Sequence, residues 1–172
     1  YGTIGVIFDN DLQKVADYIK KLSQIVYPYK LKIEGPIDLD TRENQIESLS
    51  KLTKIIDEQN INVDIVADEW CNTYEDVIDF ADNKAGHMIQ IKSPDVGSID
   101  DIVKSIIYCK EHGVKAYLGG SCNETDLSAT ISVHVGMATC ADQFLARPGM
   151  GVDEAYMIAF NEMNRIIALK NR

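Results

Sequence analysis

The chain has 172 residues, of which 45% are hydrophobic and 26% are charged, and its formal net charge is −10. This length is enough for one domain with a buried core, and the composition excludes a disordered or fibrous chain. Because it has no run of about 18 apolar residues and no basic block longer than Lys20-Lys21, it predicts neither a membrane-spanning helix nor a nucleic-acid partner.

Short apolar runs alternate with longer amphipathic runs along the whole chain. From Leu12 onward, apolar residues recur three or four positions apart, which predicts a helix with Asp9 or Asn10 as its N-cap. Gly113 stands where a left-handed C-cap is wanted. The expected strands are 30–34, 63–67, 87–92, 115–119 and 143–146, and the expected helices are 11–26, 41–59, 74–83, 99–111, 126–139 and 152–169.

This alternation predicts an α/β fold with parallel strands joined by right-handed crossovers. The sheet could be open and doubly wound, or it could be part of a (β/α)8 barrel. Polar residues follow each strand in turn, which favours the barrel, since an open sheet would gather them at one switch point. A closed barrel needs eight strands and about 250 residues. We therefore expect about five βα units from the C-terminal portion of a larger barrel.

Carboxylates end the first two expected strands. Glu34 ends the first, and Asp68 and Glu69 follow the second. Because neighbouring barrel strands converge on one axis, Glu34 and Asp68 could share a hard cation such as Mg²⁺, which prefers oxygen ligands. The alternative is that these acids are helix caps or loop residues in solvent.

Lys92 ends the third strand and shares a face with Gln90. Beside a bound cation the pKa of Lys92 should fall, which would make the amine a usable general base. A lysine at a strand end can instead extend into solvent. Two polar residues on one strand face are costly unless that face lines a cavity, and this favours a functional role.

Two glycine-containing loops follow the last two strands. In the first, Gly119 and Gly120 permit close approach of a ligand to the backbone, and Ser121 precedes a helix N-terminus that suits a carboxylate or phosphate. The alternative is a tight turn with Asn123 or Thr125 as the helix cap. The second loop is Arg147-Pro148-Gly149-Met150-Gly151, which by position is also a site loop.

Four segments of the chain resemble the methylaspartate ammonia-lyase family of the enolase superfamily, and the resemblance extends over essentially the entire chain. The segments are Val-Ala-Asp-Glu-Trp-Cys-Asn-Thr (66–73), Asn-Lys-Ala-Gly-His-Met-Ile-Gln-Ile-Lys (83–92), Gly-Gly-Ser-Cys-Asn-Glu-Thr (119–125) and Arg-Pro-Gly-Met-Gly-Val-Asp-Glu (147–154). The resemblance implies a carbon–nitrogen lyase that reversibly eliminates ammonia from (2S,3S)-3-methylaspartate to give mesaconate, with Mg²⁺ bound to a substrate carboxylate.

The resemblance also implies a role for individual residues. Glu34 and Asp68 match two of three metal ligands, and the third is an aspartate that would precede Tyr1. Lys92 matches the base that removes the C3 proton. The implied substrate-binding residues are Gln90, Ser121, Cys122 and Leu145. Ser121 replaces a threonine common in the family, so the hydroxyl is kept and a methyl is lost.

The family implies further properties of the whole protein. Residues 1–172 would form the C-terminal part of the catalytic barrel, and an N-terminal capping domain and the first barrel strands would lie outside this chain. The protein would be a cytoplasmic homodimer of glutamate fermentation, with a dicarboxylate amino acid as substrate and K⁺ as a possible activator. Four cysteines without metal-binding spacing agree with a reducing compartment.

Two alternatives stay open. Another enolase-superfamily reaction, such as racemisation or cycloisomerisation, could use a similar metal site. The chain could also be a non-catalytic half-barrel that needs a partner chain. The 172 residues alone are expected to show little turnover, because a metal ligand and three barrel strands would be missing.

Overall fold

The computed structural model describes residues 2–122, 124–146 and 149–171. In these residues, five strands and eight helices alternate along the chain. The strands are β1 (Leu31–Glu34), β2 (Val63–Ala67), β3 (Met88–Lys92), β4 (Lys115–Gly119) and β5 (Gln143–Phe144). The helices are α1 (Thr3–Ile7), α2 (Leu12–Ile25), α3 (Arg42–Glu58), α4 (Tyr74–Asp82), α5 (Ser93–Val96), α6 (Ile99–Glu111), α7 (Asp126–Thr139) and α8 (Val152–Lys170).

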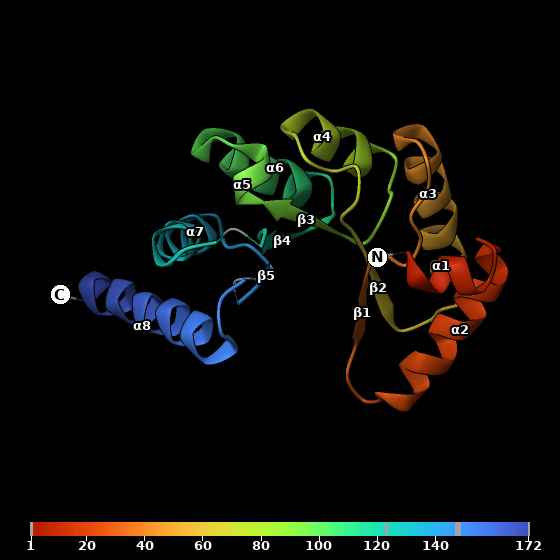
Figure 1. The fold of residues 1–172 in the computed structure, drawn as a ribbon, viewed down its shortest axis with the longest axis horizontal. Coiled ribbons are helices and arrows are strands. Elements are labelled where there is room, and N and C mark those ends of the chain that lie inside the picture. Colours follow the sequence, from red (N-terminus) through yellow and green to blue (C-terminus); the bar gives the residue numbers. More distant parts are fainter. Residues whose placement is uncertain (1, 123, 147–148, 172) are drawn as a thin grey trace.

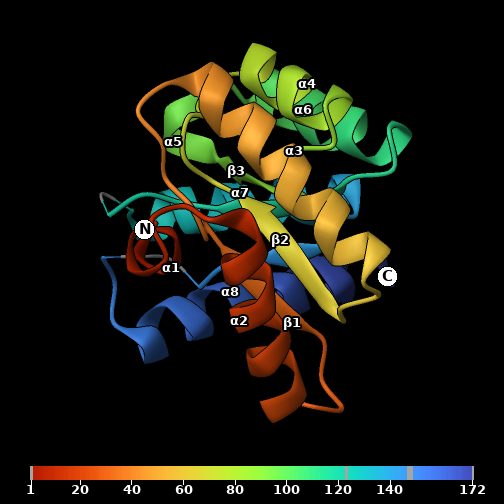
Figure 2. The ribbon, with the colours of Figure 1, turned by 90° about the vertical axis from the view of Figure 1, so that its right-hand side faces the viewer.

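The strands form one parallel sheet in the order β1-β2-β3-β4-β5, so that each strand pairs with the next one in the chain. The sheet is curved, with the helices arranged around its outer side (Figure 1; Figure 2). On the inner side, Nζ of Lys32 on β1 donates a hydrogen bond to Oε1 of Gln143 on β5. The two edge strands are thus close enough for a side-chain contact. The α/β fold and the half-barrel of five units are confirmed.

The main core lies between the outer face of the sheet and the helices. Every residue of β2 is buried, as is usual for a parallel strand covered on both faces. Ile65 and Ile89 from neighbouring strands belong to this core, as do Leu49 and Phe80 from the helices that cover them. A second, smaller cluster of Val66, Met88 and Tyr117 lies on the opposite face of the strands. Alternate residues therefore pack outward into the helical layer or inward into the half-barrel.

Helix starts follow capping chemistry. The side chain of Asp11 accepts hydrogen bonds from the backbone N–H groups of Gln13 and Lys14, so Asp11 caps α2. The expectation that Asp9 or Asn10 caps this helix is wrong, because both residues adopt a left-handed backbone conformation in the preceding turn. The C-cap expectation at Gly113 is confirmed by its φ of +70°.

Two helices were not expected from the sequence. Helix α1 is a single turn near the N-terminus, and α5 begins immediately after β3. Pro94 stands in the first turn of α5, where its missing N–H costs nothing. Strand β5 is shorter than expected and has two residues.

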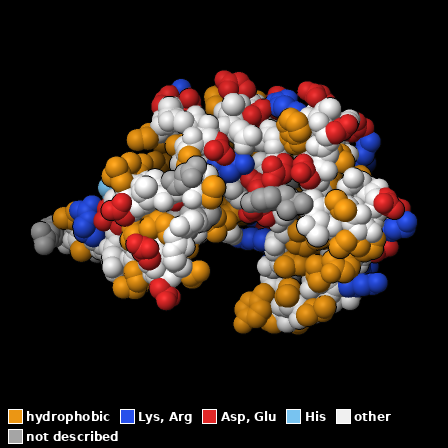
Figure 3. Space-filling model, in the orientation of Figure 1, with side chains coloured by type: hydrophobic (Ala, Val, Ile, Leu, Met, Phe, Trp, Pro, Cys, Tyr) orange, Lys and Arg blue, Asp and Glu red, His pale blue; other side chains and the backbone are white. Residues whose placement is uncertain are grey.

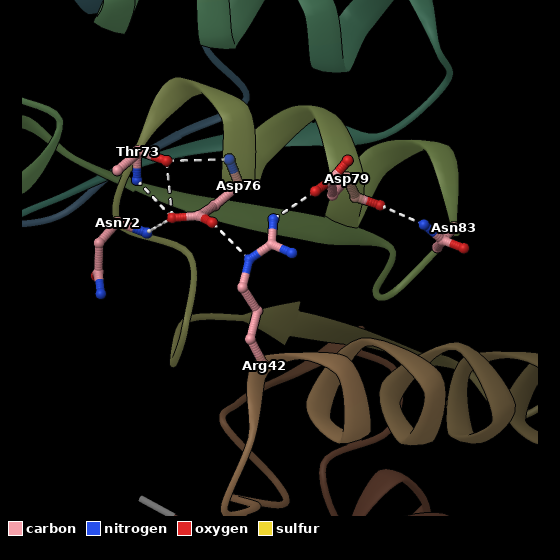
Figure 4. A network of polar contacts seen from close by, with 6 residues as sticks. All are labelled: Arg42, Asn72, Thr73, Asp76, Asp79 and Asn83. Atoms are coloured by element: carbon pink, nitrogen blue, oxygen red, sulfur yellow. Dashed lines mark hydrogen bonds and ion pairs between the residues drawn. The ribbon is translucent and has the colours of Figure 1, made fainter.

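A polar network ties α3 to α4 on the outside of the sheet (Figure 4). Nε of Arg42 lies 2.6 Å from Oδ1 of Asp76, and its Nη2 lies 2.5 Å from Oδ2 of Asp79. The other oxygen of Asp76 accepts hydrogen bonds from the backbone and hydroxyl of Thr73, which completes the capping box of α4. Burial raises the pKa of Asp76, but Arg42 and Thr73 outweigh it and keep the pKa below its usual value. The helices that follow β1 and β2 are therefore held in a fixed relation.

Candidate active site

The carboxyl ends of β1, β2 and β3 bring polar residues together on the inner side of the half-barrel. Register pairs Glu34 with Val66 on β2, and Lys92 with Gly119 on β4. Acidic side chains gather near the centre of one face of the molecule, beside the hollow on the open side of the sheet (Figure 3). The expected convergence of strand-end residues is found for Glu34, Asp68, Gln90 and Lys92.

Asp68 and Lys92 form a buried ion pair. Oδ1 of Asp68 lies 3.0 Å from Nζ of Lys92, and their side chains are 3% and 13% exposed. On the other side, Nζ of Lys92 lies 3.6 Å from Oδ2 of Asp95 in α5. The unexpected helix α5 therefore adds a second carboxylate beside the lysine.

Burial raises the pKa of Glu34, a hydrogen bond from Gln90 lowers it, the neighbouring charge of Asp68 raises it and Lys92 lowers it. The pKa of Glu34 lies above its usual value as a result. The pKa of Glu69 is also raised, first by burial and then by Asp68. Several carboxylates thus share one region with too little positive charge to neutralise them.

The pKa of Lys92 does not follow the sequence-based expectation. Burial lowers it, but the carboxylates of Asp68, Asp95 and Glu69 outweigh burial, and the pKa lies above its usual value. The chain's own carboxylates therefore favour the ammonium form. The expected fall depended on positive charge from a bound cation, which the protein residues by themselves do not supply.

The oxygen atoms of this region fit part of a Mg²⁺ site. Oδ1 of Asp68 is buried and, apart from its ion pair with Lys92, has no hydrogen-bond partner among the residues that the structure describes. Glu34 adds a second hard oxygen donor, of the type that Mg²⁺ prefers. Among residues 2–122, 124–146 and 149–171, no group of three or more His, Cys, Asp or Glu side chains is placed to hold a metal. Further ligands would come from water, substrate or other residues.

The turn after β4 is organised by an acid that sequence reasoning did not single out. Glu124 is 8% exposed, and Oε1 accepts a hydrogen bond of 3.2 Å from the backbone N–H of Ser121. Its other oxygen accepts one from the hydroxyl of Ser128. Glu124 thus already accepts the hydrogen bond of this N–H, and the contact of Ser121 with a carboxylate or phosphate stays a prediction. Thr125, one of the two expected caps, does cap α7.

The last two expected loops meet each other. A Cβ atom at Gly149 would lie 3.0 Å from the carbonyl carbon of Cys122, and Gly149 has φ +78°, so a side chain there would be strained. Cys122 itself is exposed. The structure thus places Cys122 at the contact of the two loops. Asn123, Arg147 and Pro148 lie outside the described residues.

An apolar layer lies directly beneath the polar strand ends. Leu145, which follows β5, packs against the inner cluster of Val66, Met88 and Tyr117. The residue two positions after each of these three lies on the same strand face. These residues are the polar Asp68 and Gln90 and the small Gly119. The predicted position of Leu145 in a pocket wall agrees with this packing. Apolar walls around convergent polar groups are typical of small-ligand sites.

Two more residues support the site without having been expected to. A Cβ atom at Gly119 would lie 2.5 Å from Cδ of Gln90, so only glycine leaves room for that side chain. Trp70 donates a hydrogen bond of 3.0 Å from Nε1 to the carbonyl of Leu39. A glycine at the end of one strand next to a polar residue on the neighbouring strand is a sequence signal for the contact of Gly119 with Gln90. No sequence signal reveals the hydrogen bond of Trp70 to Leu39.

Comparison with known proteins identifies relatives over the full length of the chain. A family model described as "Methylaspartate ammonia-lyase C-terminus" matches residues 1–172. Methylaspartate ammonia-lyase 2 of Carboxydothermus hydrogenoformans is 59% identical over 172 residues, covering 100% of this chain and 41% of the relative. The chain thus spans about two fifths of the length of that curated relative.

Solved structures show the same likeness. The crystal structure of beta-methylaspartase from Clostridium tetanomorphum, an Mg complex, matches with a TM-score of 0.96 at 52% identity, covering 100% of this chain and 42% of that one. Methylaspartate ammonia lyase of Citrobacter amalonaticus, containing (2S,3S)-3-methylaspartic acid, matches with 0.97 at 49% identity, covering 100% and 42%.

A more distant likeness concerns the fold alone. Muconate lactonizing enzyme from Pseudomonas fluorescens matches with a TM-score of 0.58 at 20% identity, covering 73% of this chain and 30% of that one. Together with the closer structures, it identifies the five-stranded sheet as the C-terminal portion of an enolase-superfamily (β/α)8 barrel.

Proposed function

The chain belongs to the methylaspartate ammonia-lyase family, and from that premise we propose that it forms the C-terminal catalytic part of a longer carbon–nitrogen lyase. The proposed reaction is the reversible elimination of ammonia from (2S,3S)-3-methylaspartate to give mesaconate. The observation that carries the proposal is the buried pair of Lys92 and Asp68 at 3.0 Å, with Glu34 and Gln90 beside it.

The proposed base is Lys92. In its neutral form the amine takes the proton from C3, and the electron pair of the broken C–H bond first passes to the neighbouring carboxylate. This pair then returns to form the C2–C3 double bond as the C2–N bond breaks. Ammonia leaves with the electron pair of the C–N bond, and the proton remains on Lys92 until solvent removes it. A bound Mg²⁺ would supply positive charge at the carboxylate next to C3, which makes that proton more acidic.

The other proposed residues bind and orient. Glu34 and Asp68 would be oxygen ligands of Mg²⁺, and a relative solved as an Mg complex supports this choice of metal. Gln90 donates to Glu34 and lies on the strand face that carries Lys92, where its amide can also meet a substrate carboxylate. Ser121 and Cys122 would contact the second substrate carboxylate, and Leu145 would face the methyl group.

Further properties of the whole protein are proposals from family membership. We expect an N-terminal capping domain and the first barrel strands in addition to these residues, and a homodimer. We also expect activation by K⁺, a cytoplasmic location and a role in glutamate fermentation. In the part of the chain that the structure describes, none of the helices is long and apolar enough to cross a membrane.

The test is an assay of the purified full-length protein with (2S,3S)-3-methylaspartate and Mg²⁺. We expect equal amounts of ammonia and mesaconate, the latter seen as a rise in ultraviolet absorbance, and loss of both in EDTA. The same assay in Na⁺ in place of K⁺ tests monovalent activation. Racemisation or cycloisomerisation of an acid without release of ammonia would contradict the proposal and support the second enolase-superfamily reaction.

The isolated 172-residue chain is the second sample in this assay. We expect little or no turnover from it, because Glu34 and Asp68 supply only two metal ligands from residues that the structure describes. Robust turnover would show that the missing strands are dispensable. Recovery of activity on mixing with a separately produced N-terminal part would support the view of a half-barrel that needs a partner chain.

A further inference from the structure

The segment that follows Glu34 is buried at Gly35, Pro36 and Ile37 and is anchored at both of its ends. Its backbone continues the sheet through a hydrogen bond of 3.1 Å from the N–H of Gly35 to the carbonyl of Val66. The side chain of Gln45, fully buried in α3, accepts a hydrogen bond from the N–H of Leu39 and donates one to the carbonyl of Ile37, both at 3.0 Å. One amide thus fixes the far end of the segment.

The turn that follows Asp68 reaches the same segment from the other side. Nε1 of Trp70 donates its hydrogen bond of 3.0 Å to the carbonyl of Leu39, while the N–H of the same residue donates to Gln45. Trp70 and Gln45 therefore hold one residue, Leu39, between α3 and the β2–α4 turn. This contact links the loop that begins at Glu34 to the loop that begins at Asp68.

Core packing does not account for Trp70. The residue is 39% exposed, whereas the large hydrophobic residues of the core are buried. Its backbone has φ +64°, a conformation that is rare for a bulky L-residue. Such a conformation persists where the surroundings hold it, and it clusters at functional sites. Here it aims the indole N–H at Leu39, two residues after Asp68.

We propose that Trp70 and Gln45 are positioning residues that set the spacing of the Glu34 and Asp68 carboxylates for a divalent cation. The inference rests on the proposed function, because it assigns these two carboxylates to a metal. The hydrogen bonds of both side chains go to the backbone of Ile37 and Leu39. Each acts by fixing Leu39, so that the two strand-end loops move as one unit.

The test compares two full-length variants that each lose one hydrogen bond from an aromatic side chain. Trp70→Phe removes the indole donor to Leu39 and keeps an aromatic ring. Tyr108→Phe, the matched control, removes a bond of 2.8 Å from the hydroxyl to Asp82, on the outer helices. Mg²⁺ affinity is measured by calorimetry, and hydrogen exchange of segment 35–41 is measured in metal-free protein.

For Trp70→Phe we expect Mg²⁺ to bind about fivefold more weakly, as loss of one hydrogen bond suggests, with faster exchange in segment 35–41. For Tyr108→Phe we expect wild-type affinity and exchange. Wild-type affinity in Trp70→Phe would overturn the inference even if exchange is faster, since the role would then be merely structural. Equal weakening in both variants would also overturn it. If wild-type protein binds no Mg²⁺, the metal of the proposed function and this inference fail together.

Discussion

Two buried aspartates on one strand of the half-barrel have opposite electrostatic surroundings. Asp64 and Asp68 lie four residues apart on β2 and its C-terminal extension, and they are 1% and 2% exposed. Asp64 contacts Nζ of Lys30 at 2.7 Å and Nζ of Lys115 at 2.5 Å. Asp68 has one lysine, 3.0 Å from Oδ1, and within the described part of the chain this oxygen has no hydrogen-bond partner.

The difference separates stability from function along a single strand. At the floor of the half-barrel, the side where the strands begin, burial raises the pKa of Asp64, but Lys115 and Lys30 outweigh it and keep the pKa below its usual value. At the rim, the side where the strands end, burial and the charge of Asp68 raise the pKa of Glu34 and of Glu69. A fully paired buried charge serves the fold, whereas a group of acids with too few cations costs stability, as is typical of the binding site that we propose here.

The largest expected effect is on kcat, when the lysine beside the aspartate is removed at the rim (Lys92) and, for comparison, at the floor (Lys115). Lys92→Ala in the full-length protein should lower kcat by about a thousandfold, because the proposed base is lost. Lys115→Ala removes a lysine that also contacts an aspartate of β2, but at the floor. It should leave kcat within about twofold and lower the free energy of unfolding by about 1 kcal/mol. Steady-state ammonia release and thermal unfolding measure the two effects; equal losses of kcat would remove the distinction between rim and floor.

Replacing each aspartate by its amide should lower the free energy of unfolding more at the floor than at the rim. Asp64→Asn leaves two lysines around an uncharged side chain, and because both lysines are half-exposed we expect a loss of about 2 kcal/mol. Asp68→Asn loses one buried ion pair, but Lys92 keeps Asp95 at 3.6 Å and the repulsion with Glu34 and Glu69 is relieved, so we expect a change within about 1 kcal/mol. Denaturation of metal-free full-length protein checks this. Greater destabilisation by Asp68→Asn would show that the rim also serves the fold.

A smaller, more local effect is expected at Gly119, which faces the rim but carries no charge. Gly119→Ala would place a methyl group 2.5 Å from Cδ of Gln90, so that side chain must move away from Glu34 and the substrate. We expect KM to rise about tenfold with little change in stability, since a displacement of about 1 Å can cost up to a hundredfold in rate. Gly113→Ala is a control away from the site: its Cβ position is open, but its φ of +70° strains an alanine, so stability should fall while KM is unchanged. Unchanged KM in Gly119→Ala would mean that Gln90 does not contact the substrate.

The smallest expected effect is the acid dependence of the floor. Because the pKa of Asp64 is lower in the folded state, its stabilising contribution is present above its unfolded pKa of about 4 and is lost as pH falls through the folded pKa. The charged groups that face Asp64 are Lys30 and Lys115. The stability difference between wild type and Asp64→Asn should therefore shrink below about pH 4. A constant difference down to pH 2 would exclude this linkage.

Much of the fold could be predicted because its elements are long enough to show a period. Every strand was expected within three residues of its observed ends, and Glu34, Asp68 and Lys92 were placed together because barrel geometry brings strand ends to one rim. The two missed helices, α1 and α5, have five and four residues, too short for a helical stripe to develop.

The remaining features depend on contacts between segments that are distant in the sequence. The N–H of Ser121 is bonded by Glu124 only because the turn folds back on itself. Trp70 reaches Leu39, which lies 31 residues earlier. The raised pKa of Lys92 depends in part on Asp95, in a helix that the sequence pattern did not reveal. Such contacts follow from the packed backbone and not from local composition.

The most direct test of the account is the exchange of the C3 hydrogen of (2S,3S)-3-methylaspartate in deuterated water, catalysed by the full-length protein with Mg²⁺. Exchange isolates proton removal from the loss of ammonia. The account predicts exchange by the wild type and by Lys115→Ala, and exchange lowered by about a thousandfold in Lys92→Ala. Undiminished exchange in Lys92→Ala would contradict the assignment of Lys92 as the base and of the rim of the half-barrel as the active site.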